Sequence, residues 1–314
     1  MGSTGVVILS LSVQLPQKDR PLVFYSNQHA QDLKRVICSA LHQAKSSIYI
    51  QIYGFTDPDL LELLKQKSTE GVAITIFHDK TASKNLKNDL KGFAQTYPVQ
   101  CAGLMHRKIF IIDNEQVFIG TANFTYQSLK MHDNLLIGLH HAELSRFIKK
   151  CSPNYYPFQL NEQALELFLL PDFDKSALPT LIQLIENATS KIQIAMFTLT
   201  HPELTEKLIE AARRGVEVQI AVDFYAGQGA SRKILEKMMQ ENISILLSRG
   251  EQLLHYKWAN IDDKYLVAGS ANWTRAAFEK NQDCFLTLHP LNKIQIDFLH
   301  HLWKCISYGC DQPG

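Results

Sequence analysis

The sequence predicts an α/β fold built as a tandem repeat of two halves, each a mixed β-sheet flanked by helices. Two observations carry this prediction. Helical and strand patterns alternate in the same order in both parts of the chain, and residues 106–123 recur in altered form at residues 255–272. Alternating β and α segments favour a largely parallel sheet with helices on its faces. A chain of 314 residues with 46% hydrophobic residues can bury such a core.

The elements of the two halves are predicted in matching order. Apolar residues at helical spacing predict a helix, followed by an apolar strand, a second helix that ends at a glycine, and a second strand. The segments are 31–44, 46–56, 60–67 and 72–77 in the first half and 178–188, 190–200, 204–213 and 216–222 in the second, with Gly71 and Gly215 as the terminating glycines. We therefore divide the chain into a first half (1–150), a proline-containing crossover (151–174) and a second half (175–314).

The repeated stretch has a fixed skeleton of polar residues. It reads HRKIFIIDNEQVFIGTAN in the first copy and HYKWANIDDKYLVAGSAN in the second. Both copies keep a histidine, a lysine, an aspartate, a glycine, a hydroxyl residue and an asparagine at identical spacing: His106, Lys108, Asp113, Gly120, Thr121 and Asn123, then His255, Lys257, Asp262, Gly269, Ser270 and Asn272. Two copies matched at six positions make chance a poor explanation.

The spacing of the repeat predicts a polar site on a β-hairpin. Side chains alternate across a strand, so His106 and Lys108 point to the same face. The residues around Asp113 have turn composition, and the returning strand carries Thr121 and Asn123 back beside the histidine. A cation, a hydroxyl and an amide around an imidazole suit a phosphate whose phosphorus the imidazole attacks.

The repeat resembles the HKD signature of the phospholipase D superfamily, and the resemblance extends over residues 30–290. It implies that the two copies meet at a pseudo-twofold axis and form one active site. It also implies a phosphodiesterase in which one histidine becomes a phosphohistidine, while the other protonates the leaving alcohol and then activates water, without a metal ion or another cofactor. Because both half-sites lie on one chain, we expect a monomer with no obligate protein partner.

The same resemblance assigns roles to the motif residues by position. His106 and His255 are the catalytic pair, and His106 is the expected nucleophile. Lys108, Lys257, Asn123 and Asn272 bind phosphate oxygens, Thr121 and Ser270 assist, and Asp113, Asp262, Gly120 and Gly269 are structural. The hairpin geometry agrees for the aspartates, because each stands at the corner of its hairpin.

The family also places an acidic residue about eleven positions after each motif asparagine, where it orients the histidine. Asp283 stands at this position after Asn272. In the first half the eleventh residue is Asn134, and the tenth is Asp133. Either Asp133 reaches His106, or Asn134 orients that histidine with weaker charge support.

Composition leaves two substrate classes open. Basic and acidic residues number 32 and 31, so the chain has no global positive field that would recruit nucleic acid. Apolar and aromatic residues near the motifs favour a phospholipid, cleaved to phosphatidic acid or exchanged with another alcohol: Met105, Phe124, Tyr126, Trp258 and Trp273. The alternative is an endonuclease whose nucleic-acid backbone follows Lys80, Lys84, Lys87 and Lys91. A further alternative is a catalytically silent protein that only binds phosphate.

Cysteine spacing and the N-terminal segment bear on metal binding and location. The six cysteines form no C-x-x-C pair and no Cys/His spacing typical of zinc, so we predict no metal site. The apolar stretch at residues 6–15 is too short to span a bilayer and follows no basic residue, so we expect a soluble protein without an anchor or signal peptide. The sequence does not determine the cellular compartment. Removal of a leader from the N-terminus would indicate a secreted protein.

Overall fold

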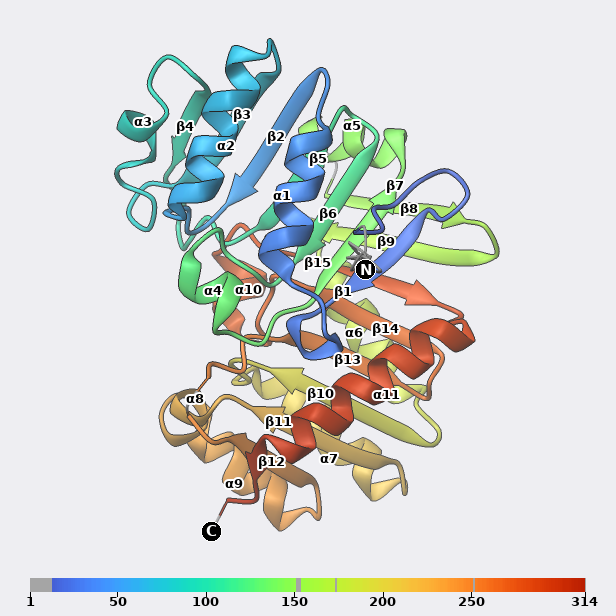
Figure 1. Cartoon of the computed structure of the whole chain (residues 1–314). Coiled ribbons are helices and arrows are strands. Elements are labelled where there is room, and N and C mark those ends of the chain that lie inside the picture. The colour runs from blue at the N-terminus through green and yellow to red at the C-terminus, as the bar shows by residue number, and fades with distance from the viewer. Residues whose placement is uncertain (1–12, 151–153, 173, 251, 314) are drawn as a thin grey trace, which may run out of the picture.

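The computed structural model describes residues 13–150, 154–172, 174–250 and 252–313, which form two mixed β-sheets with helices packed on them (Figure 1). One sheet is built from the first half of the chain, and the other from the second half together with the crossover. The α/β tandem fold predicted from the sequence is confirmed.

The first sheet has seven strands in the order β1-β7-β6-β5-β2-β3-β4. Strands β2, β3 and β4 are parallel to one another, and the other neighbours are antiparallel. The strands are β1 (Leu22–Tyr25), β2 (Ser47–Ile52), β3 (Ala73–Asp79), β4 (Gln95–Val99), β5 (Lys108–Ile112), β6 (Gln116–Gly120) and β7 (Leu136–His140). The helices are η1 (Asn27–His29), α1 (Leu33–Gln43), α2 (Pro58–Thr69), α3 (Leu86–Asp89), α4 (Tyr126–Lys130) and α5 (Ala142–Lys150).

The second sheet has nine strands in the order β16-β12-β11-β10-β13-β14-β15-β9-β8. The strands are β8 (Tyr155–Leu160), β9 (Gln163–Leu169), β10 (Lys191–Met196), β11 (Glu217–Val222), β12 (Ser244–Ser248), β13 (Lys257–Ile261), β14 (Tyr265–Gly269), β15 (Cys284–His289) and β16 (Cys310–Asp311). The helices are α6 (Ala177–Glu186), α7 (Pro202–Arg213), α8 (Phe224–Gln228), α9 (Arg232–Gln240), α10 (Arg275–Glu279) and α11 (Lys293–Tyr308). The hairpin β8–β9 lies within residues 151–174 and joins this sheet through β15.

The core runs through both sheets, and the motif strands are buried on both faces. On β5, Ile109 and Ile111 belong to a cluster that also contains residues of the second sheet, such as Leu286. The alternate residues, Phe110 and Ile112, pack with the residues of α1 and α2. Side chains that alternate between two buried faces explain why this strand is apolar without interruption.

Helix α11 of the second half packs beside η1 and β1 of the first half (Figure 1). The ring of Phe298 on this helix packs edge-on against Phe24 of β1, with ring centroids 5.6 Å apart. The imidazole of His301 contacts the backbone oxygen of Gln28, beside η1. These contacts join the two halves at the β1 edge of the first sheet, which is the edge opposite β4.

The expectation that the chain has no leader or anchor rests mainly on residues 1–12, which lie outside the described residues. Within the described ranges, no helix is both long enough and apolar enough to cross a membrane.

Each motif hairpin turns through an aspartate with a left-handed backbone. The first three-residue connection begins with Asp113 (φ 53°) and the second with Asp262 (φ 56°), and in both connections the next residue also has positive φ. Two positive φ values define the type I′ turn, whose twist matches that of the adjoining strands. The Asp113 carboxylate accepts hydrogen bonds from the backbone N–H groups of residues 45, 46 and 47, and Asp262 repeats this with residues 189, 190 and 191. Each carboxylate therefore ties the motif hairpin to the start of β2 or β10.

The motif glycines lie where two strands approach each other closely. A Cβ atom on Gly120 would stand 2.5 Å from the backbone oxygen of Leu135, and one on Gly269 would stand 2.4 Å from that of Cys284. A backbone atom cannot move aside as a flexible side chain can. The absence of a side chain thus lets the strand deliver the hydroxyl and asparagine that follow it.

Candidate active site

The segment just before each motif histidine pairs with a segment of the opposite half. Met105 forms a parallel bridge with Gln282, and the N–H of His106 donates to the backbone oxygen of Gln282 at 2.8 Å. The related bridge joins Asp133 to Leu254, and His255 N–H donates to the oxygen of Asp133 at 3.0 Å. The backbone that leads into each motif histidine is therefore held by the half that does not contain that histidine.

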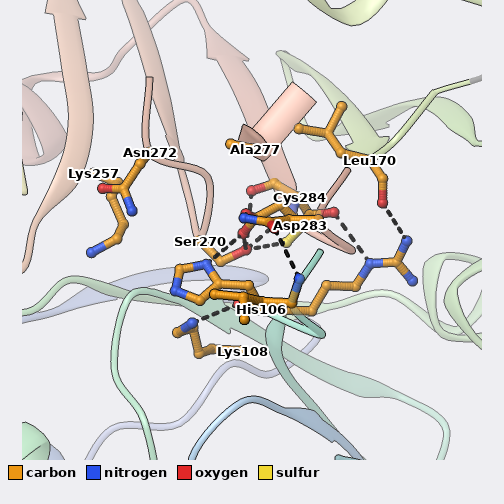
Figure 2. A network of polar contacts seen from close by, with 12 residues as sticks. His106, Lys108, Leu170, Lys257, Ser270, Asn272, Ala277, Asp283 and Cys284 are labelled. Carbon is orange, nitrogen blue, oxygen red and sulfur yellow. Dashed lines mark hydrogen bonds and ion pairs between the residues drawn. The ribbon is translucent and has the colours of Figure 1, made fainter. Parts of the chain in front are cut away.

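Each motif histidine is oriented by a side chain of the opposite half. The Nδ1 atom of His106 lies 2.9 Å from Oδ1 of Asp283, and Nδ1 of His255 lies 3.0 Å from Oδ1 of Asn134 (Figure 2 shows the first pair). A carboxylate or amide oxygen only accepts, so each Nδ1 donates its proton. In the neutral imidazole, Nε2 then carries the free lone pair.

The two sequence-based alternatives for orienting His106 are both wrong about the partner. Asp133 directs its carboxylate to Gln28, whose Nε2 donates to it at 2.5 Å. Asn134 does orient a histidine, but that histidine is His255. Spacing within one half correctly picked out Asp283 and Asn134 as equivalent positions, but it carried no information about the crossing.

The motif hydroxyls hold the orienting residues. Thr121 donates to Oδ1 of Asn134 at 2.7 Å, and Ser270 donates to Oδ1 of Asp283 at 2.6 Å. The expectation that these hydroxyls donate to a phosphate is therefore corrected, because their protons are already engaged. The same contacts set the direction in which Asn134 and Asp283 present their oxygens.

The motif lysines are buried at the same site. Lys108 Nζ donates to the backbone oxygen of His106 at 2.6 Å, and Lys257 Nζ donates to that of His255 at 2.7 Å. Each ammonium carries three protons, so donors remain for an anion. Each also lies over an aromatic ring, that of Tyr53 or Phe197, at 5.3 and 5.2 Å from the ring centroid.

The motif asparagines are fixed through their oxygens. Asn123 Oδ1 accepts from Gly54 N–H at 3.1 Å, and Asn272 Oδ1 accepts from Thr198 N–H at 3.2 Å. This leaves the Nδ2 groups as the side-chain donors on the site. Figure 2 shows Asn272 beside Lys257, so an amide and an ammonium are presented together.

The electrostatics of the two histidines differ. Burial lowers the pKa of His106, while the Asp283 carboxylate opposes that shift. Burial and then the charges of Lys257 and Lys108 lower the pKa of His255 much further, with no carboxylate to oppose them. Only His106 has an anionic partner on Nδ1.

The same burial acts on the lysines, and the cations act on the carboxylate. Burial lowers the pKa of Lys108 to about 7 and that of Lys257 well below its usual value. Burial alone raises the pKa of Asp283, but His106, Lys108 and the Ser270 hydroxyl lower it to about 2. An entering phosphate anion restores the preference of the lysines for their charged form.

Two carboxylates that support the site were missed in the sequence. Asp79 at the end of β3 accepts from Met105 N–H at 3.1 Å, and Asp223, just after β11, accepts from Leu254 N–H at 3.1 Å. Each holds the residue that precedes a motif histidine. The signal was present, because both aspartates end the equivalent repeated strand and stand in the same register relative to Gly71 and Gly215.

A third imidazole stands beside the site and was also missed. The ring of His132 lies 5.9 Å from that of His255, measured between centroids. No motif position predicts it. Among the described residues, no group of three or more His, Cys, Asp or Glu side chains is arranged to hold a metal ion.

The paired halves and their crossed His, Lys and Asn groups define a two-motif site on a tandem α/β scaffold. Residues 37–151 and 181–302 match the family model described as cardiolipin synthase, PLD-like domain. Because these residues make up more than half of the chain, the protein belongs to the phospholipase D superfamily, as its motifs predicted.

Comparisons with individual proteins agree with this membership. The chain is 28% identical over 133 residues to a mitochondrial cardiolipin hydrolase of Chlamydomonas reinhardtii, covering 42% of this chain and 57% of that protein. It is 30% identical over 121 residues to a phospholipase D of Rickettsia typhi, covering 35% and 56%. The matches thus span little more than half of these relatives.

A solved structure shares the fold over almost the whole chain. The phosphatidylserine synthase of Haemophilus influenzae superposes with a TM-score of 0.76 and 15% identity, covering 96% of this chain and 88% of that one. At this identity the likeness shows the fold alone.

Proposed function

We propose that the protein is a phospholipase D-type phosphodiesterase, which hydrolyses phospholipids or exchanges their headgroups through a phosphohistidine. The observation that carries the proposal is the crossed pair of imidazoles. His106 and His255 each donate through Nδ1 to a partner in the opposite half, so each keeps Nε2 for a substrate. Lys108 and Lys257 supply charge for the phosphate between them. The names of the relatives, cardiolipin hydrolase and phospholipase D, support a phospholipid as substrate.

The two histidines divide the reaction into two balanced steps. Nε2 of His106 attacks phosphorus, the bond from phosphorus to the leaving oxygen breaks, and that oxygen takes the Nε2 proton of His255. Water then gives a proton to Nε2 of His255 and its oxygen attacks phosphorus, which breaks the bond to His106. An alcohol in place of water gives headgroup exchange. His255 ends protonated, as it began.

The unequal partners of the histidines support these roles. A phosphohistidine that keeps its Nδ1 proton has a positively charged ring, and Asp283 stabilises that charge on His106. His255 has only the amide oxygen of Asn134, so its protonated form is a stronger acid and gives up its proton more readily. We therefore propose His106 as the nucleophile and His255 as the general acid and base.

The complete site belongs to one chain, and we propose that a monomer is active. The test is turnover of phospholipid vesicles and, in parallel, of single-stranded DNA, with a chelator present. His106→Asn and His255→Asn serve as matched variants. Release of phosphatidic acid that is lost in both variants is the expected result. Cleavage of DNA alone would identify a nuclease, and no turnover of either would favour the catalytically silent alternative.

A further inference from the structure

We propose that His132 determines headgroup specificity, by forming hydrogen bonds to the hydroxyl groups of an uncharged polyol headgroup such as glycerol. This inference rests on the proposed function, because it takes His255 as the group that protonates the leaving alcohol. The headgroup is the leaving alcohol, so it must lie beside His255. His132 is the further imidazole on that side of the site.

The position of His132 is fixed while its ring is available. The backbone N–H of His132 donates to Gln127 at 3.1 Å, and its backbone oxygen accepts from Nδ2 of Asn134 at 3.3 Å. The ring is half-buried and makes no hydrogen bond to another described side chain or backbone group. Burial and then the charge of Lys257 lower its pKa. The neutral ring offers one donor and one acceptor, which is what a hydroxyl requires.

The second half shows that the fold does not need an imidazole here. The equivalent residue stands two positions before Asp283, as His132 stands two before Asn134, and it is Asn281. Its side chain is engaged: Oδ1 accepts from Leu104 N–H at 2.9 Å and Nδ2 donates to Asp283. His132 has no comparable structural contact through its ring. Unlike Asn281, the His132 ring is therefore not committed to holding the fold and can act on a substrate beside His255.

The charges around the site disfavour a cationic headgroup. Lys108 and Lys257 are both buried there, and the carboxylates that act on them are Asp79, Asp223 and Asp283. Each of these carboxylates already accepts hydrogen bonds from the protein. Each of these carboxylates is already oriented by the protein's own donors, and the two lysine charges repel an ammonium headgroup.

The aromatic rings of the site are also occupied. A quaternary ammonium group binds over aromatic faces. The ring of Tyr53 already lies beneath Lys108, and that of Phe197 beneath Lys257. A choline headgroup thus meets two cations and two rings that already each face an ammonium, whereas glycerol hydroxyls meet the His132 imidazole.

The test compares phosphatidylglycerol with phosphatidylcholine of identical acyl chains, presented in the same detergent micelles. The variants are His132→Ala and His132→Asn, the second of which installs the residue of the other half. Met131→Ala is the matched control, because Met131 is the neighbouring residue and is exposed. A diester with p-nitrophenol as leaving group, which has no hydroxyl to bind, reports whether the chemistry is intact.

The wild-type protein is expected to prefer phosphatidylglycerol. His132→Ala should lower kcat/KM for this lipid about tenfold, the scale of one lost hydrogen bond. Its turnover of phosphatidylcholine and of the p-nitrophenyl diester should stay within about twofold, as should every activity of Met131→Ala. His132→Asn should recover part of the loss, because an amide also donates and accepts.

Two results would overturn the assignment of His132 while leaving the proposed function standing. One is an equal loss on both lipids, and the other is a wild-type preference for phosphatidylcholine. A wild-type protein that cleaves the p-nitrophenyl diester but neither lipid would instead refute the phospholipid function, and this inference with it.

Discussion

The Nδ1 atom of His106 lies 2.9 Å from a carboxylate oxygen of Asp283, which stands 177 positions later in the chain. The matching atom of His255 faces the amide of Asn134 at 3.0 Å. Two motifs with the same residue types at the same spacing are thereby placed in unlike electrostatic surroundings.

The first prediction concerns the covalent intermediate. A p-nitrophenyl leaving group departs without a proton, so His255→Asn should still form a phosphohistidine on His106 but hydrolyse it slowly. Mass spectrometry of the acid-sensitive, labelled peptide should place the phosphoryl group on residue 106. No label is expected in His106→Asn. A label on residue 255 in the wild-type protein would reverse the assigned roles.

The second prediction concerns the amide partner of His255. Asn134→Asp places a carboxylate against Nδ1, which raises the pKa of His255. Since His255 must be protonated for the first step, activity falls as pH rises through this pKa. The alkaline limb of the kcat profile should therefore move to higher pH, by about one unit. Asp133→Asn, which changes the adjacent residue, is the control and should leave the limb in place.

The third prediction concerns stability in acid. The pKa of Asp283 is about 2 in the folded protein, against 3.8 for the free group. A depressed carboxyl pKa stabilises the fold above the unfolded value, and the contribution is lost as pH falls toward the folded one. The wild-type free energy of unfolding should exceed that of Asp283→Asn by about 2 kcal/mol at pH 6, and by about half as much at pH 3. Urea titrations measure both differences, and an unchanged gap would contradict the assignment.

The fourth prediction separates structure from chemistry. Asp262→Ala leaves the N–H groups of Ser190 and Lys191 without their carboxylate acceptor. We expect a loss of about 1–3 kcal/mol in the free energy of unfolding. At a temperature where the variant stays folded, kcat should remain within about twofold of the wild-type value. Full stability with lost turnover would show that this carboxylate takes part in the reaction.

Much of the fold and of the site could be predicted from local patterns. The order of helices and strands follows from apolar periodicity, and the hairpin corner at Asp113 follows from turn composition. The motif spacing placed His106 and Lys108 at one site. These predictions succeed because each depends on residues that are near one another in the chain.

The parts that could not be predicted depend on contacts between the halves. The partner of His106, Asp283, stands just before β15, and the bridge between Met105 and Gln282 that brings it there has no local signature. Arg107, which stands between His106 and Lys108, is likewise buried and donates to the backbone oxygens of Leu170 and Asp283. Spacing within a motif contains no information about which distant segment packs against it.

The crossed hydrogen bonds also bear on how a duplicated chain can specialise. After a duplication, both copies begin with equal histidines, and a change within either motif endangers the site. Here the residue that faces Nδ1 of His255, Asn134, stands in the other copy and outside both motifs. A single exchange between aspartate and asparagine at this position gives the two histidines unlike partners, and no motif residue has to change. A single substitution can therefore give the two histidines different roles, because the residue that faces each histidine lies in the other repeat.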